Sequence, residues 1–242
     1  MKKMVVLLTL ISSVVGLAQN KKILFVVTNH TELGNTGKIT GYALSEVTYP
    51  LDVLKQAGYE VDFVSPKGGN ASATAVRLDD PINKKYWESA DYQKQLAHTL
   101  APSQVKADDY AAIFYAGGHG TMWDFADNQI LAKITQQIYE RNGIVAAVCH
   151  GSSGLLNVKL SNGKYLVSGK TLSPFTNEEE DAVKLLNVVP YSLEDKLKEH
   201  GAIIDKAGLW QDKVSVDNRV ITGQNPQSAK SVGEALVKEL AK

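Results

Sequence analysis

The sequence predicts a doubly wound α/β domain, with a mostly parallel sheet and helices on both faces of that sheet. Three observations support this prediction. Apolar runs of strand length alternate with segments of helical periodicity, which is typical of repeated β-α-β units. Glycine-bearing turns follow several of the runs, at the end of the strands where such sheets carry their sites. One run ends in Cys149, the only cysteine of the chain, in the pattern of a nucleophile elbow.

The first predicted unit lies near the N-terminus. Residues 22–28 are apolar enough for a strand buried on both faces, and residues 42–56 predict a helix that ends before Gly58. Glu60–Val64 is the next expected strand. Because a connection through a helix forces parallel pairing, these segments predict a right-handed β-α-β unit.

The middle of the chain is expected to leave the sheet and return to it. Residues 79–109 are polar, with a largely helical pattern, and we expect them to form part of a lid or a pocket wall. Residues 110–115 predict another buried strand. Residues 127–141 carry an apolar stripe at helical spacing, and the predicted helix ends at Gly143.

The C-terminal part repeats the alternation with shorter elements. Residues 166–172 suggest short strands or a hairpin, and residues 192–200 a helix capped by serine. Residues 219–223 predict a late strand, and residues 229–240 a terminal amphipathic helix. We expect a single domain over residues 19–242.

Composition agrees with one globular domain and excludes some functions. The 242 residues are 44% hydrophobic and 21% charged, which is ordinary for a folded chain. Lysines with arginines and aspartates with glutamates both number 26, so the formal net charge is zero. A neutral chain has no general attraction to nucleic acid or to an acidic membrane surface.

The N-terminus predicts a secretory signal peptide. Lys2 and Lys3 precede an apolar run over residues 4–17, which ends in the small-residue pattern before Ala18. Cleavage is expected after Ala18, with an exported, periplasmic or secreted mature protein. The run is short for a membrane span, so the mature protein is expected off the membrane. An uncleaved N-terminal anchor is the alternative.

Cys149 is the candidate nucleophile. It follows a strand of small and β-branched residues, and His150 and Gly151 come directly after it. At such a turn the amides of the following helix favour the thiolate, which is the form that attacks a carbonyl. The alternative is an inert buried cysteine that packs like any small hydrophobic residue.

His150 and a glycine turn supply candidate partners for this thiol. The unperturbed pKa of histidine suits His150 to act as a general base or acid, although it could be oriented by a carboxylate for structural reasons alone. Gly118 lies in the Gly-Gly-His-Gly turn after strand 110–115. Its amide, with that of His150, is the candidate oxyanion hole, unless the turn is only a tight connection.

Carboxylates for the site come from two places. Glu46 lies in an apolar helical stretch, where partial burial would raise its pKa, or else it faces solvent. Residues 178–181 form the densest acidic cluster of the chain. Asn177 with Glu180 fits a capping box at a helix start, so spacing alone does not decide between capping and catalysis, or among the three glutamates.

With these residues in view, the chain resembles the ThiJ/PfpI family of the class I glutamine amidotransferase-like superfamily. It is most similar to the branch of heat-shock chaperones and glutathione-independent glyoxalases. The resemblance runs from about Lys22 to Leu240. The motifs that carry it are Thr36-Gly37, Thr40-Gly41, Glu46, Pro50, Gly58-Tyr-Glu-Val61, Ser65-Pro66-Lys67-Gly68-Gly69, Gly117-Gly118-His119-Gly120, Asp124, Ala147-Val-Cys149-His150-Gly151, Gly169-Lys170 and Val220-Ile-Thr-Gly223-Gln-Asn225-Pro226.

This resemblance implies a flavodoxin-like fold and assigns roles to the candidate residues. Cys149 is implied as the nucleophile with His150 beside it, and Glu46 as a hydrogen-bond partner of the sulfur. The third member of the triad is implied at Glu180, with Glu178 as the second choice. A homodimer is expected.

The implied reaction converts a small reactive aldehyde, methylglyoxal or glyoxal, to D-lactate or glycolate. It proceeds through a hemithioacetal and a thioester on Cys149, and it requires neither glutathione, nor a metal, nor another cofactor. The resemblance also admits a holdase chaperone or protein deglycase, and, as a further alternative, a cysteine peptidase or amidase.

Overall fold

The structure, a computed structural model, describes residues 22–242. Among these residues the main sheet has six strands in the order β3-β1-β5-β6-β10-β9. All neighbouring strands are parallel except β9 and β10, which are antiparallel. The strands are β1 (Lys22–Val26), β3 (Glu60–Val64), β5 (Ala112–Tyr115), β6 (Ile144–Val148), β9 (Val214–Asp217) and β10 (Val220–Gly223).

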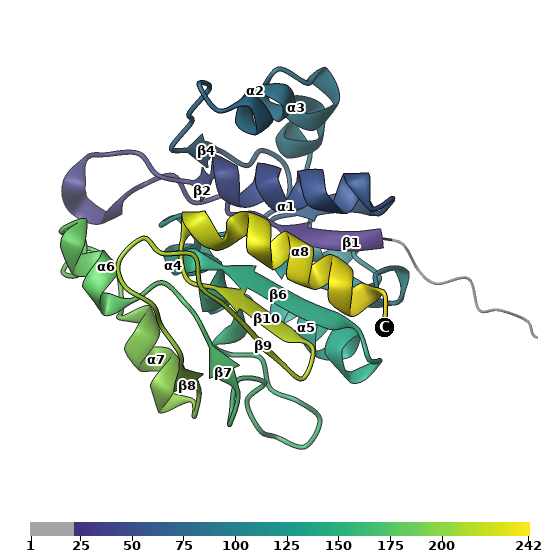
Figure 1. Ribbon diagram of the computed structural model, residues 1–242, viewed down its shortest axis with the longest axis vertical. Coiled ribbons are helices and arrows are strands. Elements are labelled where there is room, and N and C mark those ends of the chain that lie inside the picture. The colour runs from purple at the N-terminus through teal and green to yellow at the C-terminus, as the bar shows by residue number, and fades with distance from the viewer. Residues whose placement is uncertain (1–21) are drawn as a thin grey trace, which may run out of the picture.

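Helices cover both faces of the sheet, so the predicted doubly wound α/β class is confirmed. Helices α1 and α8 pack against each other on one face, and α5 packs against β5 and β6 from the other (Figure 1). The helices are α1 (Leu44–Gln56), α2 (Pro81–Trp87), α3 (Ala90–Ala97), α4 (Thr121–Asp124), α5 (Gln129–Glu140), α6 (Asn177–Ala182), α7 (Leu193–Glu199) and α8 (Ala229–Leu240).

The core lies between these helices and the sheet. Every side chain of β5 and β6 is buried, as the small and aromatic residues of both strands require. Phe25 of β1 stacks on Phe114 of β5, with ring centroids 4.5 Å apart, and meets Phe63 of β3 edge-on. The three rings lie on one face of the sheet, because Phe25 pairs in register with both Phe63 and Phe114. Strands β5 and β6 are buried on both faces, which is typical of parallel sheets.

The excursion over residues 79–109 forms α2 and α3 at one edge of the fold (Figure 1). The first residues of this excursion form a pocket wall, which is one of the two alternatives, lid or pocket wall, that the sequence analysis gave. Asp79, Pro81 and Asn83 line a cavity of about 880 Å³ together with Trp210 and Lys230.

Two predicted elements differ from the structure. The first helix begins at Leu44, because Tyr42–Ala43 (β2) pairs with Ala73–Thr74 (β4). The hairpin considered for residues 166–172 is absent there: Thr171–Leu172 (β7) pairs in parallel with Ile203–Ile204 (β8). A parallel pair needs a long crossover, and here α6 and α7 provide it.

Strand β9 has no counterpart in the sequence-based prediction. Its four residues lie at the edge of the sheet, where Ser215 is buried and the neighbouring Val216 is 48% exposed. A polar residue facing in and an apolar residue facing out reverse the usual alternation of a strand. The prediction therefore missed it.

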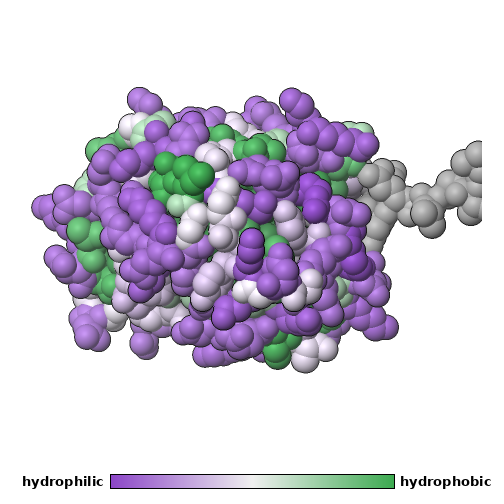
Figure 2. Space-filling view, turned by 90° about the horizontal axis from the view of Figure 1, so that it is seen from below, coloured by the Kyte–Doolittle hydropathy of each residue, from purple (hydrophilic) through white to green (hydrophobic). Residues whose placement is uncertain are grey.

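The surface shows separate hydrophobic patches. On the face turned to the viewer in Figure 2, hydrophilic residues surround small groups of hydrophobic ones. Scattered exposed apolar residues are normal for a folded domain. The expected homodimer therefore stays a prediction. No helix among residues 22–242 is long and apolar enough to cross a membrane.

The close packing of α1 on α8 depends on Gly233. A Cβ atom added there would lie 2.8 Å from Cα of Pro50, which is backbone and cannot swing away. We expect Gly233→Ala to lower the free energy of unfolding by about 1–3 kcal/mol, although alanine is otherwise the better helix former. Chemical denaturation measures the change. The exposed Glu234→Ala on the same helix should stay within about 0.5 kcal/mol of the wild type, and an equal effect of both variants would contradict this packing argument.

Candidate active site

Cys149 lies at a strained turn at the carboxyl end of β6. Its φ of 57° is left-handed, a conformation that costs energy for a non-glycine residue. The chain then enters a 3₁₀ helix, Cys149–Leu155. A Cβ on Gly151 would lie 2.3 Å from the carbonyl oxygen of Tyr115 in β5, so only glycine fits this turn. The strained backbone and the close packing are typical of a nucleophile elbow.

The glycine turn after β5 contacts the elbow directly. A Cβ on Gly117 would lie 2.4 Å from Oε2 of Glu46 and 2.9 Å from Cβ of Cys149. Gly118 has a φ of 106°, and its amide, like that of His150, interacts with the Cys149 sulfur. Both proposed oxyanion donors therefore lie beside the sulfur, and so close to the oxygen of a carbonyl group that the sulfur attacks.

Thr121 holds these two donors together. Its buried hydroxyl lies 2.9 Å from the carbonyl oxygen of Gly118 and 2.9 Å from that of His150. The carbonyl groups of the two residues that carry the donor amides thus both contact one side chain of α4. The sequence-based analysis missed this residue, and the only available signal was its position one residue after the glycine turn.

Cys149, His150 and Glu180 form a connected line of side chains. Sγ of Cys149 lies 3.3 Å from Nδ1 of His150, and Nε2 of His150 lies 2.7 Å from Oε2 of Glu180. The imidazole is enclosed, with its ring centroid 4.2 Å from that of Phe175. The adjacent cysteine and histidine thus reach each other, which spacing alone did not establish.

The charges of this line follow from its surroundings. Burial would raise the pKa of Glu180, but hydrogen bonds from His119 and His150 outweigh it and lower the pKa to about 2. Burial and the neighbouring His119 lower the pKa of His150 to about 4. At neutral pH an ionised Glu180 therefore accepts a hydrogen bond from the Nε2–H group of a neutral His150. The lone pair of Nδ1 is left facing the sulfur, as a general base requires.

Glu46, in the first turn of α1, is fully buried beside the elbow. Neither of its carboxyl oxygens has a hydrogen-bond partner of good geometry among the described residues. Burial raises its pKa to about 8, although the nearby Cys149 thiol and Gly117 amide act in the opposite direction. The solvent-facing alternative is excluded, and Glu46 is protonated at neutral pH.

The Cys149 thiol differs from the sequence-based expectation of a favoured thiolate. Burial, followed by the charge of Glu46, raises its pKa well above the ordinary value. The amides of His150 and Gly118 lower it, but by less. In the free protein the thiol therefore keeps its proton, and removing it requires a base such as Nδ1 of His150.

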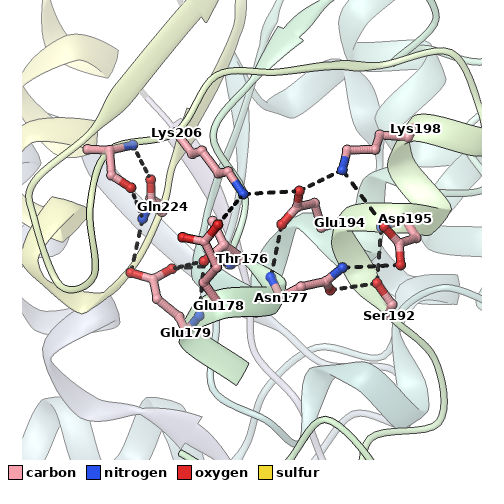
Figure 3. A network of polar contacts seen from close by, with 11 residues as sticks. Thr176, Asn177, Glu178, Glu179, Ser192, Glu194, Asp195, Lys198, Lys206 and Gln224 are labelled. Carbon is pink, nitrogen blue, oxygen red and sulfur yellow. Dashed lines mark hydrogen bonds and ion pairs between the residues drawn. The ribbon is translucent and has the colours of Figure 1, made fainter. Parts of the chain in front are cut away.

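The acidic cluster separates into three roles. The capping box of α6 is formed by Thr176 and Glu179, and not by Asn177 and Glu180 as the spacing suggested. Glu179 is buried and also accepts a hydrogen bond from Gln224 (Figure 3). It accepts two more, from Asn225 and from the amide of Trp210. Glu178 points to Lys206 at the surface. Only Glu180 reaches His150.

His119 joins the site, although the sequence-based analysis gave it no role. Its Nε2 lies 2.9 Å from Oε1 of Glu180, so both carboxylate oxygens are held by a histidine. The rings of His119 and His150 lie 4.1 Å apart between centroids. Its position within the Gly-Gly-His-Gly turn was the signal that could have identified it.

Two residues that line the cavity beside the excursion connect it to this site. Its lining residue Ala43 donates its amide to the carbonyl oxygen of Gly117, 2.9 Å away. The ring of Trp210, which also lines the cavity, lies 5.8 Å from that of Phe175, which packs on His150. The cavity thus borders the residues around Cys149, which itself is 3% exposed.

Comparison with known proteins agrees with this geometry. The model of the DJ-1/PfpI family matches residues 38–239. The chain belongs to the DJ-1/PfpI family. This family assignment confirms the resemblance inferred from the motifs.

Similar proteins cover almost the whole chain. The glutathione-independent glyoxalase HSP31 of Saccharomyces cerevisiae is 33% identical over 226 residues, 87% of this chain and 94% of that protein. The crystal structure of glyoxalase III from Candida albicans has a TM-score of 0.85 and 27% identity, and covers 91% of this chain and 98% of that one. The structure of the Rapid Encystment Protein 24 kDa (REP24) of Francisella tularensis has a TM-score of 0.88 and 38% identity, covering 91% and 99%.

The predicted export of the protein is wrong. The yeast proteins to which it is similar are named as glyoxalases, and nothing in their names marks them as exported. The predicted signal peptide, residues 1–18, lies outside the described residues. The prediction rested on two lysines before an apolar run, which is a pattern of composition alone. Signal peptides share this pattern, but no residue in it is specific to export.

The different roles of Glu179 and Glu178 predict different stabilities. We expect Glu179→Ala to lower the free energy of unfolding by about 3 kcal/mol, because several buried donors lose their acceptor together. Denaturant titration measures this loss. The neighbouring Glu178→Ala removes only an exposed ion pair and should cost less than about 1 kcal/mol. Comparable losses in the two variants would show that Glu179 does not hold α6 and the Trp210 segment.

Proposed function

We propose that this protein is a glutathione-independent glyoxalase, which converts methylglyoxal or glyoxal to a 2-hydroxy acid with Cys149 as nucleophile. The observation that carries the proposal is the contact between Sγ of Cys149 and Nδ1 of a neutral His150 held by Glu180. Relatives similar over most of the chain carry the name of this activity, which supports the choice of substrate. Holdase, deglycase and peptidase activities stay predictions.

The first step forms a bond between sulfur and the aldehyde carbon. As Sγ of Cys149 attacks, its proton passes to Nδ1 of His150, 3.3 Å away. The aldehyde oxygen gains the negative charge and lies near the amides of Gly118 and His150, which stabilise it. Protonation of this oxygen gives a hemithioacetal. The ionised Glu180 stabilises the transient imidazolium.

The second step moves a hydrogen between the two carbons of the substrate. The former aldehyde carbon loses its proton and becomes a thioester carbonyl, while the adjacent keto carbon gains a proton and becomes the alcohol carbon. One carbon is oxidised as the other is reduced, so no external oxidant is consumed. His150 and Glu46 are the groups placed to carry these protons. Water then cleaves the thioester and releases lactate, or glycolate from glyoxal.

Turnover tests the proposal directly. The purified protein should form lactate from methylglyoxal without glutathione, as followed by an enzymatic lactate assay and by loss of the aldehyde. Cys149→Ala should abolish this activity, because no atom remains to form the thioester. Full turnover by Cys149→Ala would refute the mechanism.

Glu180→Gln tests whether this carboxylate orients and charges His150. We expect turnover to fall by about 10²–10⁴-fold, as for loss of proton-transfer catalysis, with little change in stability because Glu179 and not Glu180 caps the helix. Glu178→Gln is the matched control and should keep wild-type turnover. Unchanged turnover in Glu180→Gln would remove this carboxylate from the mechanism.

Glu46 predicts the pH dependence of the reaction. With pKa values of about 4 for His150 and about 8 for Glu46, both groups are neutral between these limits. We therefore expect kcat/KM to change little between about pH 5 and 7. Above about pH 8 it should fall, because an ionised Glu46 opposes negative charge on the sulfur. Glu46→Gln stays neutral and should lack the fall. The same alkaline fall in both proteins would assign it to another group.

A further inference from the structure

We propose that His119, His150 and Glu180 form a binding site for a divalent transition metal ion of the zinc type, and that the bound ion inhibits the enzyme. Binding rests on the geometry of the three side chains alone. Its effect on turnover rests on the proposed function. The ion is therefore not a cofactor of the reaction but a regulator of its general base.

The three side chains have the composition and spacing of a metal site. One ligand atom from each lies within 4.8 Å of the other two. Nε2 of His119 and Nε2 of His150 face Glu180 at 2.9 and 2.7 Å. Two histidines and one glutamate are a common ligand set for zinc, with bonds of about 2.0–2.2 Å, so tetrahedral ligands lie roughly 3.3 Å apart. The two glutamate–histidine distances are roughly 0.4 and 0.6 Å shorter than that.

The cluster is enclosed but has one open side. The side chains of His150 and Glu180 are 1% and 6% exposed, whereas that of His119 is 22% exposed. An ion can therefore arrive past His119, and a water molecule can complete the coordination from that side. Thr176 and Glu179, next to Glu180 along the chain, hold α6 in place through the capping box and so fix the direction of the carboxylate.

Metal binding would change which nitrogen of His150 carries the proton. The ion takes the lone pair of Nε2, so the proton that Nε2 now donates to Glu180 must reside on Nδ1 instead. The total number of protons on the ring does not change. Nδ1 is the atom that faces Sγ of Cys149, and once protonated it cannot accept the thiol proton. The ion therefore blocks the first step without touching the sulfur.

The binding test uses the reduced full-length protein, with Zn²⁺ in competition with a chromogenic chelator and Co²⁺ as a spectroscopic probe. We expect one tightly bound ion per chain, and cobalt d–d bands without a sulfur-to-cobalt charge-transfer band. Cys149→Ser should bind as the wild type does, and so should the surface control His98→Asn. His119→Asn and Glu180→Gln should each weaken binding by about 100-fold or more, because each removes a ligand. Circular dichroism checks that both variants fold.

Binding results decide the site whether or not the protein is a glyoxalase. Wild-type affinity in His119→Asn, or loss of binding in Cys149→Ser, would overturn the proposal and place the ion on the thiol or elsewhere. The activity arm adds Zn²⁺ to the turnover assay. Half-inhibition at the measured Kd, reversed by chelator, is the expected result. Full turnover at saturating Zn²⁺ would overturn the inhibitory role. The binding data alone would then decide whether the site exists.

Discussion

The left-handed backbone at Cys149 determines how closely the surrounding elements must approach one another. To place this residue above the sheet, the chain has to pass against the carbonyl of Tyr115 at Gly151, where no side chain fits. Gly117 must likewise leave room for Glu46 and for the Cys149 side chain. The strained residue Cys149 thus requires a glycine in the turn after β5 and another in the turn after β6. The close packing at these glycines in turn keeps the backbone of Cys149 in its strained conformation.

Two carboxyl groups near this turn have opposite charge states because their surroundings differ. Glu46 is fully buried beside Gly117 and the thiol, and this burial keeps its proton on at neutral pH. Glu180 is nearly as enclosed but accepts hydrogen bonds from two histidines, so it is ionised. The site therefore combines a neutral acid, a neutral base and a fixed negative charge within one small volume. Such a separation of pKa values is how one site provides both proton donors and acceptors.

Much of the fold could be predicted from the sequence, because its central strands and long helices carry strong periodic patterns. The elbow was also predictable, because Cys-His-Gly directly after a strand of small residues is typical of a nucleophile elbow. Strand β9 was not, because Ser215 faces inward and Val216 outward. The acidic cluster could not be resolved either. A glutamate one position from another differs from it by about 100° around the helix, and only the tertiary contacts decide which one meets His150 and which meets Gln224 and Asn225.

The links of Glu179 to the end of the chain have a consequence for protein synthesis. The side chains of Gln224 and Asn225 hold this glutamate, and strand β10 borders the elbow strand β6. On the ribosome, Cys149 and His150 emerge long before these partners. Glu179 caps the helix that carries Glu180, and it gains these two partners only when β10 and the residues after it dock. A nascent chain therefore carries the thiol without its complete proton relay, and the reactive site is assembled only as the domain finishes folding.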